Sequence, residues 1–337
     1  MLADGVSPYM SIMNRTSCFN LNHNFESRVL PSIYTLVFLI GFPANIWGIK
    51  SLLQKWTKLG CVNVFILNLG LSNLVYLPTV PFLVVYYFMK STWIFGDTFC
   101  KMTRFCFNLN LYGSIGFLTC ISVYRYLAVI HPMRVLGRLR VAHSIAISVL
   151  VWLLVSVQSL PDITFPKSLK KDRETCYHTT THDKVHDYLV YSVGWTPTGF
   201  CLPFCIMLGC YGHVIAYLCR RNTIDKLVRQ RVLTMLVITV VLFSVCYIPH
   251  HLYKNLALQS RILTLNTTCL DSGWFNGVYV GNQISRGLVC LNLAINPLVY
   301  LHTHQGILKK IRQRLRQAAQ HLCCCAESRG TLQKLFD

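Results

Sequence analysis

Residues 232–254 read VLTMLVITVVLFSVCYIPHHLYK, an almost wholly apolar run that ends in two histidines and a lysine. A helix needs roughly 20 apolar residues to cross the hydrocarbon core of a bilayer, and this stretch is long enough. Ionisable side chains are costly at membrane depth unless the protein uses them. The stretch therefore predicts a membrane-spanning helix and raises the question of what His250, His251 and Lys254 face.

The same pattern recurs along the rest of the chain. Apolar segments of comparable length cover residues 29–53, 61–88, 97–130, 141–161, 187–218, 230–257 and 274–301. Because backbone groups in lipid must be satisfied within each helix, we expect an all-α membrane protein. Its fold would be a seven-transmembrane helix bundle followed by a short amphipathic cytoplasmic helix. The sequence shows none of the internal repeats found in many transporters.

The distribution of charge predicts the orientation. Only 13% of the 337 residues are charged, about half the fraction of a soluble domain. Lys and Arg gather in the first, third and fifth loops and after the last helix, so this side is cytoplasmic and the N-terminus extracellular. We attribute the net charge of +20 to topology and anionic lipid, not to nucleic acid. The expected divisions are an extracellular tail (1–28), a seven-transmembrane domain (29–303) and an amphipathic helix with a cytoplasmic tail (304–337).

Covalent modification is expected on the outer side. Sequons begin at Asn14 and Asn266, and both fall on the predicted extracellular face, so we expect glycosylation there. An even number of cysteines in an oxidising compartment suggests two disulfides, with the connectivity left open. The outer cysteines are Cys18, Cys100, Cys176 and Cys269.

A cysteine cluster lies on the inner side. Cys323, Cys324 and Cys325 follow the basic amphipathic run GILKKIRQRLRQAAQHL (306–322). Cysteines beside an interfacial helix suit palmitoylation. The alternative is a reduced and unmodified cluster.

Polar residues and prolines at membrane depth carry a resemblance. They are, in chain order, Asn45, Asn73, Arg125, Trp152, Pro203, Pro249, Asn296 and Tyr300. Any single Asn or Trp could be a helix-packing residue, but the whole series resembles the rhodopsin-like G-protein-coupled receptors. The chain is most similar to the metabotropic purinergic receptors, which bind extracellular nucleotides, and especially to their ADP-preferring branch. The stretches that carry this likeness are NLYGSIGFLTCIS (110–122), ISVLVWL (147–153), LGCYG (208–212), YIPHHLYK (247–254) and QISRGL (283–288).

The resemblance implies roles for individual residues. Cys100 and Cys176 would form the disulfide between the third helix and the second outer loop. Arg125 would meet the G protein. The residues implied in the activation switch are Tyr211, Tyr247, Pro249, Asn296 and Tyr300.

Helix periodicity places the candidate ligand-binding residues near the outer end, because residues three or four apart share a helix face. A cavity between these faces would be strongly cationic with few carboxylates, and Arg and Lys bind phosphate oxygens well. His250 is expected to point away, toward packing or headgroups. By resemblance, the nucleotide-binding set is Arg104, His251, Lys254, Gln283 and Arg286, with Asn108 and Asn282 as neighbours and Phe107 and Tyr112 as aromatic surface.

Two departures from the family pattern affect mechanism. Asn73 stands where the family has an aspartate that anchors sodium, although Ser114 remains, and an amide is a poor ligand for a hard cation. We therefore expect little sodium sensitivity. Tyr124 stands where an acid usually precedes Arg125, so the local salt bridge is missing and resting activity could be raised.

The sequence thus predicts a plasma-membrane receptor for an extracellular nucleotide, with ADP favoured. By resemblance it would couple to a phospholipase-C-type G protein and release calcium. No catalytic motif is present, so we expect neither an enzyme nor a cofactor or metal. Within the receptor class the alternative is a receptor for a dicarboxylate or other anionic metabolite. From another class, a non-signalling decoy receptor or a transporter remains open.

Overall fold

The computed structural model describes residues 24–54, 60–132, 139–165, 169–170, 173–174, 176, 184–220, 226–266 and 272–303. Within them, six helical stretches are long and apolar enough to cross a membrane. Helix α12 (Ser272–Thr303), of 32 residues, packs beside them against α2 and α11. The predicted helix bundle is confirmed for this part of the chain.

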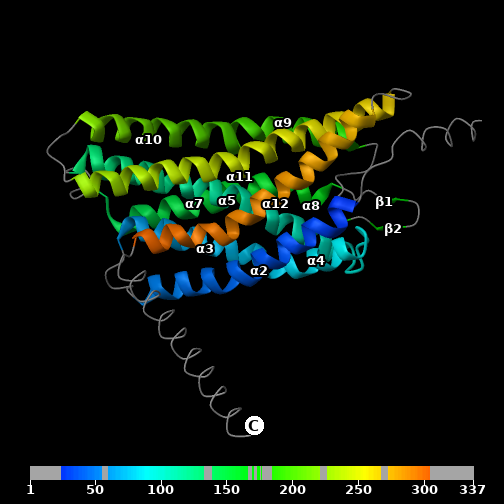
Figure 1. Ribbon diagram of the computed structural model, residues 1–337, viewed down its shortest axis with the longest axis horizontal. Coiled ribbons are helices and arrows are strands. Elements are labelled where there is room, and N and C mark those ends of the chain that lie inside the picture. Colours follow the sequence, from blue (N-terminus) through cyan, green and yellow to red (C-terminus); the bar gives the residue numbers. More distant parts are fainter. Residues whose placement is uncertain are drawn as a thin grey trace, which may run out of the picture.

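The helices lie side by side along the long axis of the molecule (Figure 1). In chain order they are α2 (Asn24–Leu53), α3 (Cys61–Tyr76), α4 (Val80–Phe88), α5 (Asp97–Ile130), α7 (Val141–Ser159), α8 (Pro161–Thr164), α9 (Val185–Thr196), α10 (Leu202–Arg220), α11 (Lys226–Asn266) and α12. A 3-10 turn, Leu77–Thr79, joins α3 to α4, and a π-helical turn, Pro197–Cys201, joins α9 to α10. The structure adds one small hairpin, in which β1 (Leu169–Lys170) pairs antiparallel with β2 (Arg173–Glu174).

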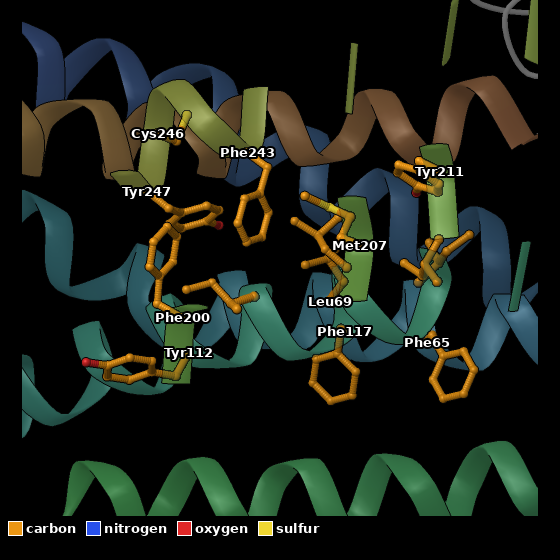
Figure 2. Packing of buried hydrophobic residues seen from close by; sticks show 14 of the residues in the cluster. Phe65, Leu69, Tyr112, Phe117, Phe200, Met207, Tyr211, Phe243, Cys246 and Tyr247 are labelled. Carbon is orange, nitrogen blue, oxygen red and sulfur yellow. The ribbon is translucent and has the colours of Figure 1, made fainter. Parts of the chain in front are cut away.

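Helix α5 occupies the middle of the bundle and packs against α3, α7 and α10. Its Leu111, Ile115 and Phe117 are buried with Leu69 of α3 and Met207 of α10 in one apolar cluster (Figure 2). Many large apolar side chains point outward instead, among them Leu39, Leu153 and Val190, each at least 60% exposed. A bundle with a packed interior and an apolar exterior is the arrangement that a bilayer requires.

A disulfide ties the start of α5 to the segment after β2. Cys100 and Cys176 form this bond, with their Cα atoms 5.6 Å apart and both residues fully buried. The implied pairing of these two cysteines is confirmed. We call this end of the bundle, where α8, β1 and β2 also lie in Figure 1, the disulfide end.

Several sequence predictions fall outside the described residues. These are Asn14, Cys18, Cys269, Cys323, Cys324, Cys325 and the amphipathic helix within 304–337. Asn266 ends α11 and Tyr300 lies in α12, but their side chains are not described. The expected glycosylation, second disulfide and palmitoylation therefore stay predictions.

Candidate ligand-binding site

A polar cavity of about 60 Å³ opens toward the disulfide end between α5, α8, α9, α11 and α12. Several side chains predicted to bind ligand meet there, including three cationic ones from three helices. Its lining consists of Arg104, Phe107, Asn108, Asp162, Tyr188, His250, Lys254, Ala257, Asn282 and Arg286.

One wall of the cavity is a buried hydrogen-bonded network around Asp162. Arg104 Nη2 donates to Asp162 Oδ1 over 3.2 Å, and Asn108 Nδ2 donates to Asp162 Oδ2 over 2.6 Å. The Tyr188 hydroxyl also donates to Asp162 Oδ1 over 2.7 Å. The Arg104 and Asp162 side chains are only 8% and 3% exposed, so this ion pair is shielded from solvent. Such a pair is retained only with good geometry and additional hydrogen bonds, and both are present.

The other two cations approach from α11 and α12. Lys254 Nζ lies over the Tyr188 ring, 5.6 Å from its centroid, within the range of a cation–π contact. The Arg286 guanidinium lies near the tyrosines of α2 and α4, Tyr34, Tyr86 and Tyr87. Because Lys254 and Arg286 line the same cavity, both positive charges are brought to one small volume.

Several polar atoms of the lining lack a hydrogen-bond partner among the described residues. They are Arg104 Nη1, both ring nitrogens of His250 and Asn282 Oδ1, all of them buried. A buried polar atom left dry costs about 1–3 kcal/mol, so such atoms usually contact water or a ligand. Their clustering around one cavity indicates a site for a polar guest.

The expectation that His250 points away from the bundle interior is wrong. Its side chain lines the cavity, is 3% exposed and packs edge-on to Phe107, with ring centroids 5.7 Å apart. At about 100° per residue, Lys254 lies about 40° from His250 and about 60° from His251 around the helix. Both histidines are therefore compatible with the face of Lys254.

Three of the predicted ligand residues lie behind the cavity wall. The His251 ring stacks on Phe200 with centroids 4.4 Å apart, and Tyr112 contacts it from α5 at 5.9 Å. Gln283 is 2% exposed on α12 and is not among the lining residues. The structure thus gathers Arg104, Phe107, Asn108, Lys254 and Arg286 at the cavity and places His251, Tyr112 and Gln283 next to it.

The sequence interpretation missed Asp162 and Tyr188 and expected few carboxylates near the cations. A sequence signal for Asp162 existed, because an acid at the end of an apolar segment is a functional candidate by default. Its partner could not be read from the sequence, since α8 is separated from α7 by a single residue, Leu160.

An aromatic column extends from His251 toward the middle of the bundle. Phe200, placed by the π-helical turn, stacks on His251, and Phe243 packs against Tyr247 with centroids 4.8 Å apart. Figure 2 shows the Phe200, Phe243 and Tyr247 rings gathered at one place between α10 and α11. Asn292 Nδ2 of α12 donates to the Tyr247 hydroxyl. The column thus connects the cavity wall to the contact between α11 and α12.

Below the column, asparagine side chains connect four helices. Asn73 Oδ1 accepts from Asn110 Nδ2 (3.0 Å) and from Asn296 Nδ2 (3.2 Å). Asn73 Nδ2 donates to Asn45 Oδ1 over 2.8 Å, and Asn45 Nδ2 donates to the Leu293 carbonyl over 2.8 Å. The network is made of neutral amides that satisfy one another.

At the end opposite the disulfide, Arg125 lies beside Tyr211. Among the described residues it forms no ion pair, which agrees with the absence of an acid at Tyr124. A second cavity, of about 160 Å³ and mainly apolar, has Leu118, Arg125, Phe243, Asn292 and Asn296 in its lining. The residues implied in switching are therefore close to open space between α5, α11 and α12.

The bundle and its polar interior define a membrane receptor of the seven-helix class. The model of the 7 transmembrane receptor (rhodopsin family) matches residues 44–300, and the chain belongs to this family of G-protein-coupled receptors. It is a signalling receptor, not an enzyme.

Curated relatives agree with this assignment. Purinoceptor 1 of Mus musculus and that of Homo sapiens are each 36% identical to the chain over 321 residues, covering 94% of it and 84% of the relative. The 2-oxoglutarate receptor 1 of Rattus norvegicus is 32% identical over 287 residues, covering 85% of this chain and 83% of that protein.

Proposed function

We propose that the protein is a plasma-membrane receptor for an extracellular nucleotide, with ADP favoured. In this proposal agonist binding activates a G protein that stimulates phospholipase C and releases calcium, and the N-terminus is extracellular. The observation that carries the proposal is the meeting of Arg104, Lys254 and Arg286 at one buried cavity. The similarity to purinoceptor 1 supports the choice of ligand class.

The ligand phosphates would lie between Lys254, Arg286 and the unpaired Nη1 of Arg104, because guanidinium and ammonium groups bind phosphate oxygens strongly. Phe107 would offer an aromatic face to the base. A ligand changes the conformation only through its differential affinity for two states. The contacts that could transmit this difference run from His251 through Phe200 to Tyr247 and Asn292.

The size of the cavity supports a second candidate, a receptor for a dicarboxylate. A volume of about 60 Å³ equals roughly four to six water-sized probes. A small dianion needs little rearrangement to enter, whereas a nucleotide requires α11 or α12 to move outward. One relative is a 2-oxoglutarate receptor, which agrees with this alternative.

Calcium and cyclic-AMP responses of cells that express the chain would separate these candidates. The panel is ADP, ATP, UDP, UTP, succinate and 2-oxoglutarate, with untransfected cells as the control. We expect a calcium response to ADP that Arg286→Ala removes. A response to dicarboxylates alone would replace the nucleotide proposal by the second candidate, and silence toward the whole panel at normal surface expression would favour a decoy.

A further inference from the structure

Asp162 is the one carboxylate in the described cavity lining, and it lies where a ligand anion would be expected. Its side chain is 3% exposed, and it accepts hydrogen bonds from Arg104, Asn108 and Tyr188 at 3.2, 2.6 and 2.7 Å. Arg104 is one of the three cations of the cavity. One of the three is thus paired with an anion that belongs to the protein itself.

The charge of the empty cavity follows from its lining. Three cationic side chains and one carboxylate leave a formal charge of +2 when His250 is counted as neutral. Without the carboxylate, three like charges would share a small volume, where a pair 4 Å apart repels by about 4 kcal/mol at an effective dielectric constant of 20. Asp162 therefore stabilises the empty site and reduces the negative charge that a ligand must supply.

We propose that Asp162 is a specificity-determining residue that selects ligands with two anionic groups over ligands with three. This inference rests on the proposed function, in which an anion binds this cavity. Two phosphates or two carboxylates can be matched by Lys254 and Arg286. A third anionic group would approach Arg104 and meet Asp162 there, and juxtaposed like charges cost several kcal/mol in a recognition site.

The proposal leaves Arg104 a role in binding. Its Nη1 is buried and has no hydrogen-bond partner among the described residues, so it can donate to a ligand while Nη2 stays with Asp162. Arg104 then contributes direction but little net charge. The ligand class that fits is a nucleoside diphosphate or a dicarboxylate, and triphosphates and tricarboxylates are disfavoured.

Dissociation constants measured on the purified full-length receptor test this assignment. They are taken from the concentration dependence of thermal stability with ADP, ATP, succinate and citrate in magnesium-free buffer. Each pair differs by one anionic group, so the ratio of constants within a pair cancels general effects of a mutation on folding. We expect wild type to favour ADP and succinate, and Asp162→Asn to shift both ratios by at least about tenfold toward ATP and citrate.

Two control variants make the result specific. Asp97→Asn removes an exposed acid that pairs with Lys101 on the same helix as Arg104, and both ratios should stay at their wild-type values. The double variant Asn108→Asp with Asp162→Asn keeps the formal charge and can keep a hydrogen bond between these positions with donor and acceptor exchanged. It should restore both ratios toward wild type, and it keeps the test open if the single variant does not fold.

The outcomes separate this inference from the function on which it rests. If wild type binds ADP or succinate but neither ratio moves in Asp162→Asn, the role of Asp162 is refuted and the anion site stands. The same holds if Asp162→Asn shifts the ratios and the double variant leaves them shifted. If wild type binds none of the four probes, the proposed function fails and this inference fails with it.

Discussion

At the scale of single residues, Asn73 shows how an amide changes the interior of the bundle. Its side-chain oxygen accepts from Asn110 and Asn296, and its nitrogen donates to Asn45. An aspartate at this position would bring a negative charge and favour a cation nearby. With four neutral amides satisfying one another, the network is complete without an ion.

We therefore predict that sodium has little effect on agonist affinity, less than about twofold, since a neutral amide is a weak ligand for a hard cation. Agonist binding would be compared in sodium chloride and in choline chloride at equal ionic strength. Asn73→Asp is the matched variant, and it should gain sodium sensitivity. A strong sodium effect in wild type that disappears in Ser114→Ala would contradict this prediction.

At the scale of secondary-structure elements, local connections determine which side chains reach the cavity. Helix α8 starts at Pro161, directly after the residue that follows α7, and presents Asp162 to α5. The π-helical turn Pro197–Cys201 places Phe200 against His251. The Cys100–Cys176 disulfide fixes the start of α5, and therefore the approach of Arg104, to the outer segment.

We predict that Cys100→Ser lowers the stability of the receptor by about 2–5 kcal/mol, the usual cost of losing a native disulfide. Thermal unfolding in detergent and surface expression would measure the loss. Cys106→Ser, on the same helix, is the control because Cys106 is a free, partly buried cysteine. Equal stability of the two variants would show that the disulfide does not hold this end together.

At the scale of the whole molecule, the helix bundle could be predicted from the sequence because membrane-spanning helices follow from length and apolarity alone. The cations of the site could also be predicted, since ionisable residues at membrane depth are conspicuous. The rotation of α11 was harder. His250 and His251 flank Lys254 around the helix axis, and only packing against Phe107 and Phe200 decides what each one faces. Asp162 was missed because its partners come from α5 and α9, which are distant in sequence.

Along the bundle, the described polar residues form a series of connected sites. The cationic cavity lies toward the disulfide end, the aromatic column below it reaches Tyr247, and the asparagine network and Arg125 follow. All of these lie between helices of the same bundle, as Figure 1 shows for α5, α11 and α12. Binding at the cavity can thus bias the contact between α11 and α12, provided that the ligand prefers one of two arrangements.

The central claim is that the cations of the cavity bind an anionic ligand, and the affinity of the Lys254→Gln variant tests it most directly. Affinities of ADP and of 2-oxoglutarate would be measured on the purified wild type and variant. Lys101→Gln is the control, because it removes a partly exposed lysine that pairs with Asp97 near Arg104. Losing one member of a buried charged contact costs about 2 kcal/mol or more, so the bound probe should bind at least about 30-fold more weakly to Lys254→Gln. The Lys101→Gln variant should bind like wild type. Equal affinities in all three proteins would contradict the account.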